Sequence, residues 1–186
     1  MARYGALLDA CALVPIVLAD TLLRIAERGL YRPLWSGPIL DEAKDAVLAI
    51  HPALAPEAVA SRFHDMDDTF EDALVTGWAP LIDGIVLPDV DDRHVVAAAM
   101  RGGAQAIVTF NLKDFPDATL APLDIAAVHP DTFLLDQLDL APPLVLDVLR
   151  EQAAHTRRPK LDVEDVVARL ARAGTPGFAD EVRRHL

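Results

Sequence analysis

Short apolar runs alternate along the chain with longer segments in which apolar residues recur every three or four positions. The runs predict buried strands, because a strand packed on both faces is apolar throughout, and the periodic segments predict helices. Strands that alternate with helices in this way predict an α/β fold whose parallel sheet is covered on both faces. The apolar runs lie at residues 5–8, 33–35, 84–88, 106–110 and 125–128.

Glycine, proline and capping residues set the ends of the expected helices. Gly29 ends a periodic segment over residues 12–28, and a cap and proline at 36–38 begin a helix that reaches about residue 50. An acid at 91 or 92 caps a helix that closes at 102–103. Further helices are expected between 52 and 72 and near 130–138, 142–155, 162–173 and 177–185.

The charge distribution divides the chain into two parts. The protein has 17 basic and 29 acidic residues, which give a net charge of −12. Residues 141–186 are close to neutral, so the first 140 residues carry the acidic excess. The change falls at Pro142, which predicts a main domain over residues 1–140 and a helical extension over residues 141–186. The basic residues of the extension, Arg157 and Arg158 among them, form either a solvated helix face or contacts for phosphate groups.

Composition excludes several classes of protein. An acidic chain does not bind nucleic acid through its average field, although a local site with cations between carboxylates and phosphates stays open. A single cysteine excludes a disulfide framework and a multi-cysteine zinc site. The sequence has no run of 18 or more uncharged apolar residues, and Asp9 interrupts the N-terminal apolar stretch. We therefore expect a cytoplasmic protein without a membrane segment.

Polar residues with oxygen ligands follow three of the predicted strands. The carboxyl ends of parallel strands meet at one edge of a sheet, where ligands bind. Each acid alone is explained as a helix cap, but like charges brought together destabilise one another unless a cation lies among them. The residues are Asp9 after the first strand, Asp89, Asp91 and Asp92 after the strand at 84–88, and Asn111 and Asp114 after the strand at 106–110.

Glu42 is a further candidate for the same site. On the helix from about residue 37 to 50 it lies on the stripe of Ile39, Ala46 and Ile50, which predicts that it points inward. Asp41 shares a different face, which predicts that it faces solvent. An acid that points inward needs a partner, either the other acids through a cation or a residue such as arginine.

The candidate ligands are all oxygen donors, without an accompanying set of histidines or cysteines. Such a set favours Mg²⁺ or Mn²⁺ over zinc or copper. Carboxylates that hold these ions position and deprotonate water and neutralise the developing charge of a phosphodiester. We interpret His94 as a helix-surface residue and Cys11 as a small buried thiol. Arg93 is also interpreted as a surface residue, although its place beside the acids suits a phosphate.

Three segments resemble the PIN-domain ribonucleases, in particular the VapC-like toxins of bacterial toxin–antitoxin pairs. The most specific is LPDVDDRHVVAAAMRGGAQAIVTFNLKDFP at residues 87–116, which combines an acid, a helix, paired glycines, a strand and Thr-Phe-Asn-x-x-Asp-Phe. The others are LLDACAL at residues 7–13 and WSGPILDE at residues 35–42. Together the matching segments span residues 5 to about 130 in the family's order.

The resemblance implies a three-layer α/β/α sandwich with a central parallel sheet and an endoribonuclease that depends on Mg²⁺ or Mn²⁺. It also implies an RNA substrate, a homodimer and a cognate antitoxin protein. Either Asn111 or Asp114 is then the direct fourth ligand. The matching site residues are a catalytic quartet of Asp9, Glu42, Asp92 and Asp114, metal ligands Asp9, Asp92, Asp114 and Asn111, and the supporting or substrate residues Thr109 and Arg93.

Other interpretations stay open. A haloacid-dehalogenase-type phosphatase requires Asp-x-Asp after its first strand, where this chain has Asp9-Ala10-Cys11. A response-regulator receiver requires its acid pair at the same place, whereas the pair here comes much later. Within the PIN resemblance, the chain is a toxin, an RNA-processing nuclease without an antitoxin, or a non-catalytic scaffold that binds proteins. The intact set of acids argues against the scaffold.

Overall fold

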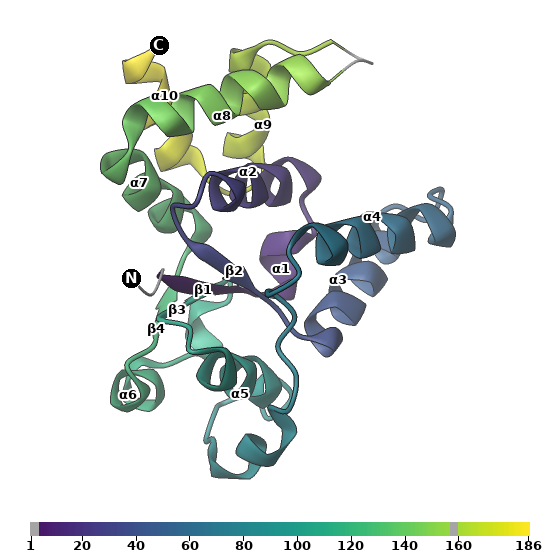
Figure 1. Cartoon of the computed structure of the whole chain (residues 1–186), viewed down its shortest axis with the longest axis vertical. Helices are drawn as coiled ribbons and strands as arrows, with labels where there is room; N and C mark the ends of the chain where they lie inside the picture. The colour runs from purple at the N-terminus through teal and green to yellow at the C-terminus, as the bar shows by residue number, and fades with distance from the viewer. Residues whose placement is uncertain (1–3, 157–159) are drawn as a thin grey trace. The chain divides into compact units, whose positions relative to one another are not determined.

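The structure, a computed structural model, describes residues 4–156 and 160–186. Four strands form one parallel sheet in the order β2-β1-β3-β4 (Figure 1). β1 and β3 are buried along their whole length, as expected for central strands that are apolar on both faces. The predicted α/β class with a parallel sheet is confirmed. The strands are β1 (Gly5–Leu8), β2 (Arg32–Leu34), β3 (Ala106–Val108) and β4 (Ala126–Val128).

The register of the sheet places the ends of β1 and β3 side by side. Leu8 pairs with Val108, and the backbone N–H of Asp9 donates to the carbonyl of Val108 at 3.1 Å. Asp9 and Thr109 therefore leave the sheet at neighbouring points. This is the edge at which the sequence predicts the acids.

The strand predicted at residues 84–88 is wrong. The preceding residues form a 3₁₀-helix, η1 (Ala79–Gly84), and residues 85–88 are irregular. Val86 is 74% exposed, whereas Ile85 and Leu87 are buried, and the Val86 carbonyl accepts a hydrogen bond from the Thr119 hydroxyl. A short apolar run does not by itself separate a strand from a loop that buries alternate side chains, because pairing with a neighbour decides.

Contacts between residues group the chain into two compact units. The sheet unit holds residues 4–14 and 32–128, and the helical unit holds residues 15–31 and 129–186 apart from 157–159. The predicted division into a main domain over residues 1–140 and an extension over residues 141–186 stays a prediction.

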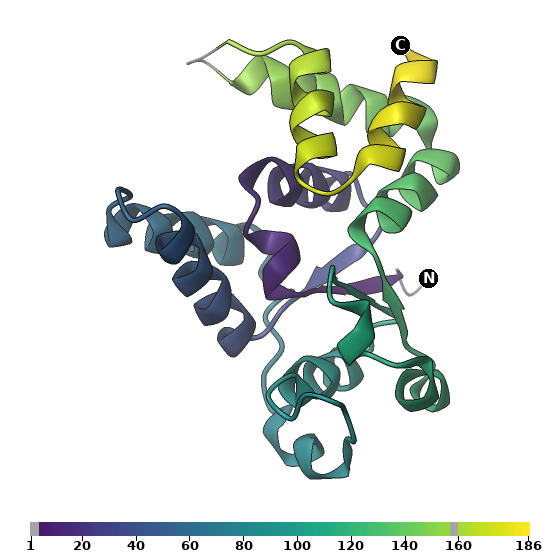
Figure 2. The ribbon, with the colours of Figure 1, turned by 180° about the vertical axis from the view of Figure 1, so that it is seen from behind.

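Helices of the sheet unit pack on the strands and on one another. α5 contacts β1 and β3, and α6 contacts β4. α3 and α4 lie side by side in both views (Figures 1 and 2). Gly103 ends α5 with a φ of 63°, a left-handed conformation that glycine adopts without strain. The bounds are α1 (Ala10–Leu13), α3 (Gly37–Ile50), α4 (Pro56–Thr69), α5 (Arg93–Gly102) and α6 (Asp117–Leu120), with 3₁₀-helices η2 (Leu112–Asp114) and η3 (Ala121–Leu123).

The helical unit confirms the helices predicted after the last strand. The helix predicted over residues 12–28 is instead two helices, α1 and α2, because Pro15 between them has no backbone N–H to donate. Arg157 and Arg158 lie outside the described residues. Within the described part of the chain, no helix is long and apolar enough to cross a membrane. The bounds are α2 (Ile16–Glu27), α7 (Pro130–Leu140), α8 (Pro142–His155), α9 (Val163–Arg172) and α10 (Pro176–His185).

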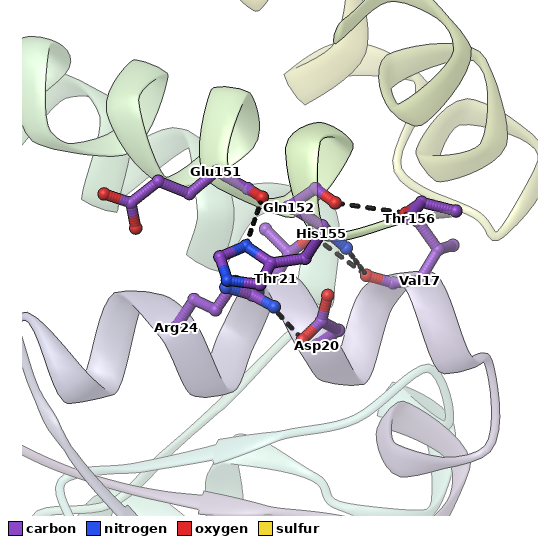
Figure 3. Close-up of polar contacts among 8 residues, drawn as sticks. All are labelled: Val17, Asp20, Thr21, Arg24, Glu151, Gln152, His155 and Thr156. Carbon is purple, nitrogen blue, oxygen red and sulfur yellow. Dashed lines mark hydrogen bonds and ion pairs between the residues drawn. The ribbon is translucent and has the colours of Figure 1, made fainter. Parts of the chain in front are cut away.

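Polar side chains join α2 to α8 inside the helical unit (Figure 3). The hydroxyl of Thr21, which is fully buried, donates to Gln152 Oε1 at 2.7 Å, and Gln152 Nε2 donates to the Val17 carbonyl at 3.0 Å. On α2 itself, Arg24 pairs with Asp20 at 2.9 Å. Burying the Thr21 hydroxyl and the Gln152 amide is tolerated because each finds a partner.

Candidate active site

Asp9 anchors the site at the carboxyl end of β1. Its Oδ1 accepts a hydrogen bond from the backbone N–H of Ala10 at 2.8 Å, so the carboxylate caps α1 as well. Its Oδ2 accepts from the Thr109 hydroxyl at 2.6 Å and from the Cys11 thiol at 3.1 Å. These bonds fix the orientation of a buried carboxylate, and they explain the supporting role predicted for Thr109.

Asn111 and Asp114 are joined to the same network after β3. The Thr109 hydroxyl accepts from the backbone N–H of Asn111 at 3.0 Å, and Asn111 Nδ2 donates to Asp114 Oδ2 at 2.5 Å. The sequence leaves open whether Asn111 or Asp114 is the direct fourth ligand. In the structure the two side chains are hydrogen-bonded to each other. The Lys113 ammonium lies 4.0 Å from Asp114, on the solvent side.

Cys11 is part of this network and is not a free nucleophile. Its sulfur accepts from the backbone N–H of Phe110 at 3.3 Å and lies 3.3 Å from the Thr109 hydroxyl. Burial and then the negative charge of Asp9 raise the pKa of the thiol to about 12. A thiol with this pKa stays protonated at neutral pH, which agrees with the prediction of an unreactive side chain.

Asp92 lies at the N-terminus of α5, where its side chain makes no capping hydrogen bond. Burial is the main cause that raises its pKa to about 6. The remaining causes are the negative charges of neighbouring carboxylates. The carboxylates concerned are Asp9, Asp89, Asp114 and Glu42, in that order.

The predicted orientation of Glu42 is wrong. The buried face of α3 is formed by Ile39, Leu40, Ala43 and Val47, while Ile50 is 60% exposed. The Glu42 side chain is about half exposed and lies beside that face, so it avoids the apolar core. Burial still raises its pKa, the positive charge of His94 opposes this, and the charge of Asp9 adds to it.

His94 is the residue that sequence reasoning missed. Its side chain is only 12% exposed, and its Nε2 lies 2.9 Å from Glu42 Oε1, so it is not a helix-surface residue. Its ring also lies 6.1 Å from the Trp78 ring, at an angle of 54°. The partner of Glu42 is thus a histidine on α5, and no local pattern in the sequence links residue 94 to residue 42.

Arg93 precedes His94 in the first turn of α5 and is half-buried. Its Nε is buried without a hydrogen-bond partner among the described residues. This corrects the interpretation of Arg93 as a plain surface residue. The substrate contact predicted for it stays a prediction.

The donor set suits a divalent cation in kind, because carboxylate and amide oxygens are the ligands that Mg²⁺ and Mn²⁺ prefer. The arrangement of these side chains is looser than the coordination shell of a bound ion. Over residues 4–156 and 160–186, no three His, Cys, Asp or Glu side chains lie close enough together to hold a metal ion. The four carboxylates share an electrostatic environment while Asp9 is held by Thr109, Cys11 and Ala10.

Comparisons with known proteins match both parts of the chain. A family model described as the PIN domain matches residues 5–113, and one described as the VapC50 C-terminal domain matches residues 130–184. The chain is 67% identical over 49 residues to the "Putative ribonuclease VapC50" of Mycobacterium tuberculosis (strain ATCC 25618 / H37Rv). That match covers 26% of this chain and 29% of the relative, which is less than a third of its length. No solved structure matches the chain significantly.

The first of these models spans more than half of the chain, including both strands that end at the carboxylates. A parallel sheet bordered by helices is the three-layer α/β/α architecture that the resemblance implies. PIN-domain ribonucleases as a class use divalent metal ions, and the oxygen donors gathered here agree with that chemistry. The chain belongs to the PIN-domain family.

Proposed function

We propose that this protein is an endoribonuclease that hydrolyses RNA phosphodiester bonds with Mg²⁺ or Mn²⁺. The observation that carries the proposal is the hydrogen-bonded network that joins Asp9, Thr109, Asn111 and Asp114 at the ends of β1 and β3. The charges of Asp9, Asp114 and Glu42 also contribute to the raised pKa of Asp92. Carboxylates gathered without matching cations destabilise the fold, so their presence together favours a functional role. The similarity to a mycobacterial relative named as a ribonuclease supports the same activity.

The residues divide into those that hold a cation and those that act beside it. Asp9, Asp92 and Asp114, with the amide of Asn111, would hold the ion. Such an ion neutralises the charge that develops on the phosphodiester and lowers the pKa of bound water. Thr109 keeps the Asp9 carboxylate in place through its hydrogen bond of 2.6 Å.

Glu42 and Arg93 are assigned to the substrate side of the site. Glu42 is about half exposed, and we assign it to orienting the attacking water and accepting its proton. The half-buried Arg93, next to Asp92 at the start of α5, is assigned to a phosphate oxygen of the RNA backbone. This assignment uses a positive charge where the surrounding carboxylates would otherwise repel the substrate.

The partners proposed for the protein follow from the family. We propose a VapC-like toxin that forms a homodimer and pairs with an antitoxin protein, supported by the match of residues 130–184 to the VapC50 C-terminal domain. A PIN nuclease without an antitoxin and a non-catalytic scaffold are the competing possibilities. Co-purification of the chain with the product of an adjacent small reading frame supports the toxin, and its absence favours an RNA-processing nuclease.

The activity is tested by cleavage of a labelled single-stranded RNA in Mg²⁺, in Mn²⁺ and in EDTA. Asp92→Asn removes one ligand charge at nearly constant volume, and we expect the cleavage rate to fall by about 100-fold or more. Asp41→Asn is the matched control, because Asp41 neighbours Glu42 on α3 but pairs with Lys44 at 3.0 Å in solvent. Equal loss in both variants, or wild-type cleavage that persists in EDTA, would contradict the proposed site.

A further inference from the structure

Trp78 differs from the other tryptophan of the chain in its surroundings. Trp35 is fully buried, and its indole N–H donates to Asp67 Oδ1 at 2.8 Å. Trp78 is half-buried, and its side chain is partly exposed to solvent. A large aromatic side chain that is left partly in solvent is more typical of a binding surface than of a core.

Trp78 lies next to the carboxylate site. Its ring is 6.1 Å from the ring of His94, and His94 Nε2 is 2.9 Å from Glu42 Oε1. One ring contact and one hydrogen bond therefore separate Trp78 from a residue assigned to the attacking water. A planar group stacked on Trp78 would lie beside the phosphodiester that Glu42 faces.

The backbone holds Trp78 in place from both sides. Before it, the segment around Leu74 forms a bridge to Trp35, with the Val75 N–H donating to the Trp35 carbonyl at 2.8 Å. After it, the Trp78 carbonyl accepts from the Leu81 N–H at 2.9 Å as η1 begins. Gly77 has a φ of +70°, so a side chain at that position would strain the turn into Trp78.

The negative charge of the site favours a contact to RNA that does not depend on charge. The protein carries a net charge of −12, and the carboxylates around Asp92 repel phosphates. Of the basic groups nearby, His94 is engaged by Glu42 and the Nε of Arg93 is buried. Stacking of a base on an aromatic ring needs no charge and contributes about 1–3 kcal/mol per base.

We propose that Trp78 is a stacking platform for an RNA base that flanks the scissile phosphate. The proposal rests on the proposed ribonuclease function and adds a base subsite to it. A protein partner is the other occupant that an exposed tryptophan would suit. The position of Trp78 against the His94–Glu42 pair favours the base.

Binding is measured with a labelled single-stranded RNA of about 16 nucleotides and with Asp92→Asn as the background, so that cleavage does not interfere. Both tryptophans contribute to the intrinsic fluorescence, but Trp35 is fully buried, so quenching by bound RNA reports on Trp78. We expect the RNA to quench this fluorescence, and the quenching to disappear in Trp78→Phe. An unquenched signal at RNA concentrations that saturate binding would overturn the proposal.

Affinity gives a second readout. We expect Trp78→Leu to raise the Kd for the RNA by about 5- to 150-fold, and Trp78→Phe to restore most of the affinity. Val86→Ala is the matched control, because Val86 is an apolar side chain of the same unit that is 74% exposed. If Trp78→Leu simply fails to fold, it loses affinity for RNA whichever bases the RNA carries. RNA with single abasic positions completes the test, because it probes the base subsite without a change in the protein.

In the Asp92→Asn background, one abasic position along the RNA should weaken binding more than the others, and Trp78→Leu should remove that difference. Equal affinity of Trp78→Leu and its parent for the RNA would overturn the proposal. A change in fluorescence that an antitoxin protein causes and the RNA does not would also overturn it. Failure of the ribonuclease proposal is distinguishable, because it appears as wild-type protein that does not cleave RNA in Mg²⁺ or Mn²⁺ whatever its fluorescence.

Discussion

The two units of the molecule treat their carboxylates differently. In the helical unit, Asp131 accepts hydrogen bonds from the backbone N–H groups of Gly177 at 3.0 Å and Phe178 at 2.7 Å, at the N-terminus of α10. Glu164 pairs with Arg183 at 2.7 Å. In the sheet unit, burial and then neighbours of its own sign raise the pKa of Asp92.

This difference separates structural acids from candidate functional ones. An acid satisfied by a helix N-terminus or an arginine stabilises the fold in its charged form. An acid held among other acids destabilises the fold at neutral pH and becomes favourable only when a cation enters. Residue type alone does not distinguish the two cases, because aspartate serves in both units.

The largest expected effect is the stabilisation of the fold by a divalent metal ion, which tests the candidate functional acids. Saturating Mn²⁺ or Mg²⁺ should raise the free energy of unfolding by about 2.7 kcal/mol at a hundredfold excess over Kd, because the ion binds the folded site and not the dispersed acids. Asp92→Asn should be nearly indifferent to metal. Urea melts with EDTA and with metal measure both. The control is Asp147→Asn, since Asp147 pairs with Arg150 in the helical unit; a metal response that survives in Asp92→Asn would place the ion elsewhere.

The second expected effect concerns Asp131, an acid that stabilises the fold in its charged form. Asp131→Ala removes two hydrogen bonds from the start of α10 and should lower the free energy of unfolding by about 1–2 kcal/mol. Asp131→Asn keeps an acceptor and should lose less. RNA cleavage, measured well below the melting temperature, should be unchanged in both. Loss of cleavage in a folded Asp131→Asn protein would show that the two classes of acid are not separate.

A smaller effect is expected for the buried contact between α2 and α8. Thr21→Val keeps the shape of the side chain but removes the hydroxyl that donates to Gln152 at 2.7 Å. We expect a loss of about 1 kcal/mol, because one acceptor is left without its donor. Thermal melts of Thr21→Val beside Thr21→Ser, which keeps the hydroxyl, measure it. A Thr21→Ser protein as unstable as Thr21→Val would assign the loss to packing instead.

The last expected effect is a dependence of stability on pH, which solvent screening of the partly exposed Asp92 reduces. In metal-free protein the pKa of Asp92 is about 6 when folded, against 3.8 for an ordinary aspartate, so the folded state binds the proton more tightly. The free energy of unfolding should therefore fall as pH rises between these two values and level off above them. The raised pKa of Glu42 acts in the same direction. Asp92→Asn should show a flatter profile in urea melts, and an identical slope would contradict the pKa shift.

Much of the fold was predictable because its signals are local. The apolar run that precedes Asp9, the one at residues 106–110 and the glycine stop at 102–103 each lie within a few residues of the structure they specify. The parallel arrangement then follows from the alternation of strands and helices. The meeting of Asp9 with Thr109 was predictable for the same reason, because adjacent parallel strands end at one edge.

The sequence by itself thus determined the strands that lead to Asp9 and to Thr109, most of the helices and the chemical kind of the candidate ligands. The tertiary structure alone decided that residues 85–88 form no strand, that Glu42 lies beside the apolar face of α3, and that His94 turns inward to meet it. These outcomes depend on contacts between segments far apart along the chain. Periodicity reports only which face of an element is apolar, whereas the neighbour that an edge position meets is set by how the helices pack.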